Sequence, residues 1–185
     1  MTDKNLSLYK KSALRIKVAN TGRIIKMNKI QISDIKTFMS KLLIKEDFDN
    51  FLLKEATITT YNTFTIDGRI KEAFYSSDEL ESMPQKTFSQ WTTIKPYCYN
   101  IIKGKKLPVS FKIVLKMNDE VTLNLLKESG APLNIADVEG LYLTIKYENN
   151  SLDCISATSL YTFTMDKTLE NYFDKSIEKH LLALS

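Results

Sequence analysis

Apolar and polar residues alternate along much of the chain, a spacing that predicts β-strands with one buried face. The clearest case is Val109–Met117, in which Phe111, Ile113 and Leu115 alternate with lysine and valine. Threonine, isoleucine and aromatic residues are dense from residue 51 to 66 and predict one long strand-forming stretch there. Together, the predicted strands are 13–18, 23–26, 29–32, 51–66, 69–74, 109–117, 141–147, 152–157 and 160–165.

Apolar residues spaced three or four positions apart predict helices instead. Three of these segments are preceded by residues that cap helix N-termini, namely Ser33, Asn118 and Asp166. Pro96 is expected in the first turn of a further helix that ends at Gly104, because proline suits a helix start and glycine a helix end. The predicted helices are 33–44, 96–104, 119–129 and 168–184, and residues 76–86 are expected to form a loop or one helical turn.

One stretch of the sequence occurs twice. Thr57–Asp67 reads TITTYNTFTID, and 99 residues later Ser156–Asp166 reads SATSLYTFTMD. Each copy follows a predicted strand and a capped helix, so the chain is expected to contain two pseudo-repeated β-α-β-β-β halves. The Asp67-Gly68 pair at the end of the first copy predicts a two-residue hairpin turn into the strand 69–74.

These elements predict an α+β fold, with a largely antiparallel sheet and the helices on one of its faces. A β-α-β-β-β unit used twice is similar in element order to one domain of the sliding DNA clamps, although a fold alone does not establish a function. We expect residues 27–185 to form a single domain that follows a basic N-terminal extension of residues 1–26.

The net charge of +4 is unevenly distributed over the 185 residues. Residues 1–29 carry +7, and residues 30–185 carry −3. A basic extension can bind nucleic acid or an anionic surface; it can also be a solvated leader, or translation can begin at Met27 rather than Met1. No apolar run approaches the roughly 20 residues of a membrane span, and no signal peptide is evident. We therefore expect a cytoplasmic protein without a membrane partner.

Residues that commonly carry catalysis or bind metals are few. His180 is the single histidine, and Cys98 and Cys154 stand apart without the CxxC spacing of metal or redox sites. Neither GxxxxGK[ST] nor GxGxxG occurs, so no cofactor and no metal are expected. Enzyme activity is not favoured, but a site assembled from distant residues stays open. Its first candidates are Asp67, Asp166, Tyr161 and Cys154, although both aspartates also suit a turn or a helix cap.

A row of uncharged polar residues is one candidate partner surface. Alternation along the 51–66 stretch places Thr59, Tyr61, Thr63 and Thr65 on one strand face. Such a row either faces solvent or forms a flat surface that binds a partner.

A lysine cluster is the second candidate surface. Lys103, Lys105 and Lys106 follow a predicted helix, and Trp91 precedes them. Lysines bind phosphates and aromatic rings stack on bases, so this set predicts nucleic-acid binding. The simpler interpretation is that lysines near a helix C-terminus stabilise the helix dipole.

Four segments resemble a known family. They are DIKTFMSKLL (34–43), FDNFLLKEATITTYNTFTIDG (48–68), IKPYCYNIIKGKKLPVSFKIVL (94–115) and SLYTFTMDKTLE (159–170). They resemble uncharacterised proteins of low-GC Gram-positive bacteria, which are classified as a domain of unknown function. The resemblance covers about residues 27–184 and implies a cytosolic bacterial protein, without any activity or site residue.

Three hypotheses about function follow from the sequence. The leading one is a non-catalytic binding or adaptor domain with an unidentified protein partner. The alternative is a nucleic-acid-binding, clamp-like protein. A further alternative is an enzyme whose site the sequence does not reveal.

Overall fold

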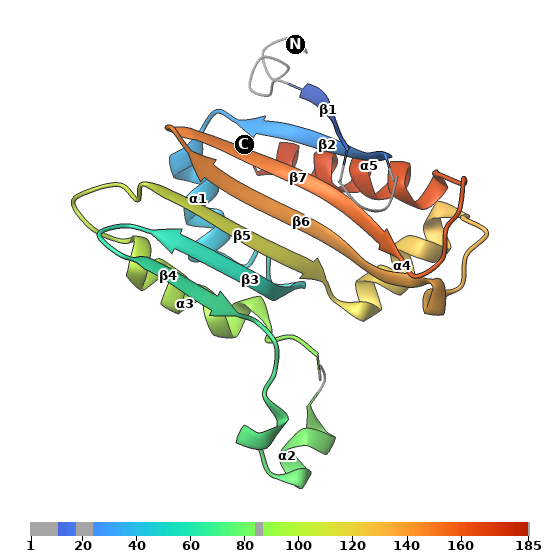
Figure 1. The fold of residues 1–185 in the computed structure, drawn as a ribbon, viewed down its shortest axis with the longest axis horizontal. Coiled ribbons are helices and arrows are strands. Elements are labelled where there is room, and N and C mark those ends of the chain that lie inside the picture. Colours follow the sequence, from blue (N-terminus) through green and yellow to red (C-terminus); the bar gives the residue numbers. More distant parts are fainter. Residues whose placement is uncertain (1–10, 18–23, 84–86, 185) are drawn as a thin grey trace.

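The computed structural model describes residues 11–17, 24–83 and 87–184, and within them the strands form one antiparallel sheet (Figure 1). The strand order is β1-β2-β7-β6-β5-β3-β4. The strands are β1 (Lys11–Lys17), β2 (Ile24–Ile32), β3 (Phe51–Thr59), β4 (Thr63–Asp67), β5 (Ser110–Met117), β6 (Val138–Glu148) and β7 (Ser151–Leu160). The boundary expected between an extension and the domain, at residues 26 and 27, falls inside β2, and residues 1–10 and 18–23 lie outside the described part.

The helices confirm the predicted α+β class with an antiparallel sheet. They are α1 (Ile35–Leu43), α2 (Ser77–Ser82), α3 (Trp91–Ile102), α4 (Asp119–Ser129) and α5 (Thr168–Ala183), with short 3-10 turns η2 (Glu72–Phe74) and η3 (Ile135–Asp137). Helices α1, α3, α4 and α5 lie together on one face of the sheet, behind it in Figure 1. We call this the helical face and the opposite side the open face.

The core lies between the helices and the helical face. Ile113 pairs with Ile145 and Leu115 with Leu143 across β5 and β6, and all four side chains are fully buried. The C-terminal helix packs against the same face, over β7, with buried residues at the predicted helical spacing: Leu169, Phe173, Ile177 and Leu181. Because apolar residues mostly alternate along the strands, the majority of them point to this one face.

The helix caps were predicted with mixed success. The Asn118 side chain accepts a hydrogen bond from the Val121 N–H at 2.8 Å, as expected for the start of α4. Gly130 ends that helix with a left-handed φ of 67°, which glycine adopts without strain. Ser33 was the wrong cap for α1, because Asp34, one residue later, accepts the Thr37 N–H at 3.0 Å.

Helix α3 begins earlier than predicted. Trp91 is its first residue and is 0% exposed, and the indole N–H donates to the carbonyl of Leu42 at 3.0 Å. Pro96 therefore lies inside the helix, not in its first turn. The proline leaves the carbonyl of Thr92 without its helical donor, at a cost of about 3 kcal/mol. Burial of Trp91 and Cys98 against the core offsets this cost.

The stretch predicted as one strand, 51–66, is a hairpin. β3 ends at Thr59, and Thr60 N–H donates to the carbonyl of Asn62 at 2.9 Å in the turn. β4 then returns beside β3, with Ile58 opposite Phe64. Because β4 returns beside β3, Phe64 and Ile66 lie on the helical face next to Ile58 and Ala56. In a straight strand they would extend beyond the sheet.

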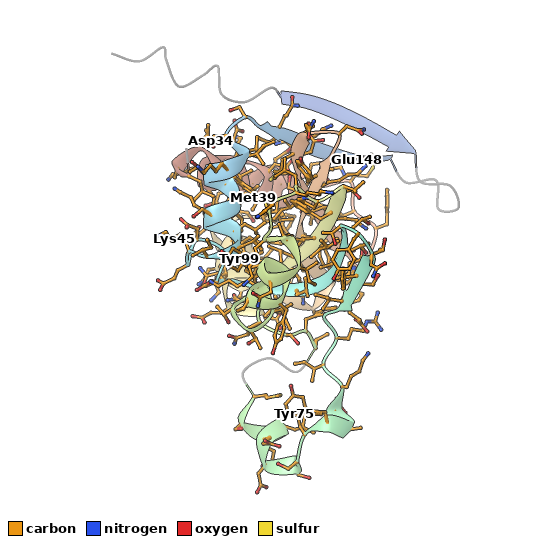
Figure 2. All side chains as sticks on the ribbon, turned by 90° about the vertical axis from the view of Figure 1, so that its left-hand side faces the viewer. Asp34, Met39, Lys45, Tyr75, Tyr99 and Glu148 are labelled. Carbon is orange, nitrogen blue, oxygen red and sulfur yellow. The ribbon has the colours of Figure 1, made fainter. Side chains whose placement is uncertain are left out.

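Asp67-Gly68 does not form the predicted two-residue hairpin, and residues 69–74 are not a strand. Gly68 is buried beside a bulge in β3, where its N–H donates to the carbonyl of Lys54 at 3.0 Å. The chain then leaves the sheet as an arm, residues 70–83, that contains η2 and α2. Figure 1 shows this arm projecting past β4. In Figure 2 the label of Tyr75 identifies the arm, which lies apart from the body of the molecule.

The two predicted pseudo-repeated halves are not confirmed. In the second half β5, β6 and β7 are neighbours, whereas in the first half β2 is separated from β3 by three strands. The first TFT sequence forms β4, but the second lies in the loop 161–167 between β7 and α5. The predicted strand 160–165 is therefore wrong, because β7 ends at Leu160.

We predict that Gly68→Ala destabilises the fold. A Cβ at this position would lie 1.8 Å from the backbone oxygen of Leu53, so β3 or the arm must shift. Forced overpacking of this kind costs about 1–3 kcal/mol. Urea unfolding should measure this loss. Gly104→Ala is the control, because its Cβ would meet nothing closer than 3.9 Å. Equal stability of the two variants would contradict the close approach.

Candidate functional site

The open face of the sheet is polar, and three of its described lysines are paired with carboxylates. Lysine Nζ atoms lie 2.7–2.9 Å from carboxylate oxygens in the ion pairs Lys112–Glu55, Lys146–Glu148 and Lys29–Asp153. Among the side chains that the structure describes, these pairs leave little uncompensated positive charge on this face. The open face is thus poorly suited to phosphate groups, which require unpaired cations.

The threonines predicted as a partner surface do lie together on the open face, although on two strands. Thr59 is opposite Thr63, and their hydroxyl oxygens are 3.1 Å apart. Thr65 is opposite Thr57. Tyr61 lies at the tip of the hairpin, where its ring makes an edge contact with Phe64 at 5.9 Å between centroids. Whether these residues bind a partner stays a prediction.

Tyr142 occupies the middle of the open face and was not singled out from the sequence. The Lys54 ammonium lies 4.4 Å from the centroid of its ring. Gly140 leaves room for this packing, because a Cβ there would meet Lys116 Cε at 2.8 Å. Burial, with the nearby Glu139 carboxylate, raises the pKa of Tyr142 to about 12. The phenol is therefore protonated at neutral pH and serves packing.

The lysine cluster is exposed, but Trp91 is not part of it. Lys103, Lys105 and Lys106 follow α3, and the Lys103 Nζ lies 5.6 Å from the centroid of the Tyr99 ring. None of the three forms an ion pair with another described residue. The prediction that Trp91 stacks on bases is wrong, because its indole is fully buried in the core.

The thiols and the single histidine lie in environments that suppress their ionised forms. Burial raises the pKa of the Cys98 thiol to about 12 and raises the pKa of Cys154 further. Burial likewise lowers the pKa of His180, whose ring packs edge-on against Phe48 at 5.3 Å. Among the described residues, no group of three or more potential metal ligands comes together. These side chains behave as core residues.

The two aspartates of the recurring stretch make the same local contact. The Asp67 Oδ1 accepts the N–H of Arg69 at 3.0 Å, and the Asp166 Oδ1 accepts the N–H of Thr168 at 2.9 Å. An aspartate that binds the backbone two residues ahead opens a turn. Lys71 also donates to Asp67 at 2.8 Å, which lowers the pKa of that carboxyl group. Turn formation thus accounts for both carboxylates. The predicted cap at Asp166 is wrong by one residue, because Lys167 is the N-cap of α5.

Three strongly exposed apolar residues lie together on one loop, at one end of the molecule. Tyr161, Phe163 and Met165, in the loop between β7 and α5, are 70%, 75% and 85% exposed. The loop starts beside η3, because the Tyr161 N–H donates to the carbonyl of Asp137 at 2.9 Å. Ile135, in η3, is also exposed. We call Ile135, Tyr161, Phe163 and Met165 the apolar end.

A shallow groove of about 430 Å³ adjoins the apolar end. It is lined by Leu123, Leu126, Lys127, Gly130, Ala131, Leu133, Asn134, Ile135 and Ala136. Sequence reasoning missed this surface, since alternation in LYTFTM resembles that of a strand. The residue that distinguishes a loop from a strand here is Asp166, because a turn-forming aspartate shortly before a helix favours a loop.

Comparison with known proteins identifies a family. The family described as "Family of unknown function (DUF5721)" matches residues 41–184 of the chain. No curated protein and no solved structure matches the chain. The resemblance noted in the sequence is thereby confirmed as a family of unknown function, and its bacterial origin stays a prediction. Of the described helices, none has both the length and the apolar character needed to cross a bilayer.

We predict that both thiols react slowly in the folded protein. Raising the pKa of Cys98 from 9.0 to about 12 lowers its thiolate fraction about thousandfold at pH 8. Iodoacetamide should therefore label the native chain at least about a thousandfold more slowly than the urea-unfolded chain. Cys98→Ser isolates Cys154 for the same measurement. Fast native labelling of Cys154 would contradict the packing role and revive the enzyme hypothesis.

Proposed function

We propose that this chain, which belongs to the family of unknown function DUF5721, is a non-catalytic binding domain that holds a partner protein against its apolar end. The observation that carries the proposal is the exposure of Tyr161, Phe163 and Met165 on one loop of a well-packed body. Contiguous exposed apolar residues mark interaction sites in most proteins, because water contact with them is unfavourable.

The adjoining groove supports a protein as the partner. Its walls combine the aliphatic side chains of Leu123, Leu126 and Leu133 with exposed backbone around Gly130. An apolar side chain of the partner can enter the groove, and the loop 161–167 can contact the partner next to it. Aromatic and methionine residues next to a concave apolar surface are typical of protein interfaces.

The buried state of the reactive groups supports a non-catalytic role. Both thiols and His180 are held in neutral forms by burial, and the phenol of Tyr142 stays protonated. Catalytic nucleophiles and bases instead have pKa values close to the working pH. The expectations of a cytoplasmic location, of no cofactor, and of a partner surface at Thr59, Tyr61, Thr63 and Thr65 accompany this proposal.

Nucleic-acid binding is the second candidate function. It is favoured by the exposure of Lys103, Lys105 and Lys106 and by their lack of acidic partners among the described residues. Tyr99 supplies an aromatic ring beside the cluster, with its centroid 5.6 Å from the Lys103 ammonium. The burial of Trp91 and the paired charges of the open face argue for a weaker, phosphate-only contact.

Photo-crosslinking tests the proposed partner surface. We replace Tyr161 with benzoylphenylalanine, irradiate the full chain in an extract of its host, and expect one discrete adduct with another protein. Tyr97 on α3 is the matched control position, because it is also a tyrosine and is 62% exposed.

Competition makes the test specific. An excess of unlabelled chain should abolish the adduct, and the same excess carrying Phe163→Ser and Met165→Ser should not. No adduct from position 161, or the same adducts from position 97, would contradict the proposal. Adducts with lipid, together with cosedimentation on lipid vesicles, would assign the loop to a membrane surface instead.

Fluorescence anisotropy of labelled single-stranded DNA tests the second candidate. Replacing Lys103, Lys105 and Lys106 with glutamate should weaken binding and reduce the salt slope of log K by about 2, since each lost contact contributes about 0.7. The control carries the same charge change at Lys36, Lys175 and Lys179, which are exposed on other helices. An equal loss in both variants would show that net charge, and not this cluster, determines the affinity.

A further inference from the structure

β4 is an end strand whose outer edge is unpaired among the described residues. It pairs with β3 alone, and the order of the sheet ends at β4. The Gly68 N–H points toward β3, where it donates to Lys54. Backbone groups alternate in direction along an antiparallel strand. The N–H and carbonyl groups of Thr63, Thr65 and Asp67 therefore point to the free edge.

The sequence leaves this edge unprotected. Natural sheets discourage pairing at their edges with lysine, proline or a bulge. β4 reads TFTID and contains none of these, and its register with β3 is regular. The strand at the opposite end of the sheet, β1, reads KSALRIK and carries three basic residues. An accessible edge without such protection is suited to adding another strand.

We propose that β4 pairs antiparallel with β4 of a second copy of this chain, with Thr65 on the two-fold axis. The proposal follows from the sequence of the strand, because it is self-complementary in this register. Thr65 pairs with its own counterpart, and Thr63 pairs with Asp67 of the second copy. These pairs supply about six backbone hydrogen bonds, since each hydrogen-bonded pair exchanges two.

The side chains match on both faces of the joined sheet. On the helical face, Phe64 lies opposite Ile66 of the second copy, and both are only half-buried in the single chain. Their contact removes apolar surface from water on both sides of the axis. On the open face, the Thr63 hydroxyl can donate to the Asp67 carboxylate, whose charge Lys71 already balances at 2.8 Å. No like charges meet in this register.

The arm is placed to flank the second copy. It leaves the sheet directly after β4 and projects past that edge (Figures 1 and 2). Its helical segments η2 and α2 contain no buried residue, and Phe74 is 83% exposed, in contact with Tyr75 at 5.1 Å. An arm without a core of its own gains apolar contacts when a second molecule occupies the space beside it.

Sedimentation velocity of the full chain tests the proposal. We expect the wild-type chain to sediment with twice the mass of one chain. Thr65→Pro removes the N–H that faces the axis but keeps every hydrogen bond between β3 and β4, and proline is tolerated on edge strands. This variant should dissociate at least about tenfold more readily, because two central hydrogen bonds are lost.

Two further variants keep the result decisive. Thr65→Val retains the N–H and should remain dimeric. Thr63→Pro places proline at the first strand position, where it is least disruptive, and should dissociate even if Thr65→Pro fails to fold, as judged by circular dichroism. A monomeric wild-type chain, or a folded proline variant that remains as dimeric as the wild type, would overturn the proposal. Loss of the dimer would leave the crosslinks from Tyr161 unchanged, so the two proposals are tested separately.

Discussion

The sheet buries one face only, and most of the molecule follows from this constraint. Helices α1, α3, α4 and α5 need an apolar surface to cover, and alternate residues on the strands supply it. The other face must remain stable in water, so its described lysines pair with carboxylates within and across strands, and two of its threonine hydroxyls contact each other. Neither face constrains the edges of the sheet or the loops at its corners. Unpaired backbone and exposed apolar side chains therefore collect at those edges and corners.

Sequence patterns predicted the parts of the fold that depend on neighbouring residues. Alternation located β5 and most of β6, and the pair Asn118 and Gly130 located α4, because strand faces and helix caps are determined within a few positions. Contacts between distant residues could not be predicted in this way. Trp91 starts α3 because its indole reaches the Leu42 carbonyl 49 positions away. Asp67-Gly68 resembles a hairpin turn in sequence. Glycine is required at position 68 for a different reason, because the backbone there lies too close to β3 for a side chain. The exposed lysines were predictable, whereas the apolar end was not, since its loop has the alternation of a strand.

The recurring TFT sequence shows how far local identity determines structure. In both copies the aspartate accepts the N–H two residues ahead, so this local hydrogen bond is the same. What precedes the aspartate differs, because the first copy lies beside β3 and the second pairs with no strand among the described residues. As a strand, the sequence presents an unpaired backbone edge. As a loop, it presents its aromatic side chains. One short sequence thus provides two different kinds of surface, according to whether a neighbouring strand is present.

The arm is joined to the sheet through a narrow neck. The backbones of Arg69 and Phe88 form an isolated antiparallel β-bridge. On either side of it, the Ile70 N–H donates to the Thr87 carbonyl at 3.1 Å, and the Ser89 N–H donates to the Gly68 carbonyl at 2.8 Å. These bonds hold the two ends of the arm together independently of what lies between them. The arm contributes no buried residue from η2 or α2, so a change in its length or sequence leaves the packing of the core intact as long as these bonds remain.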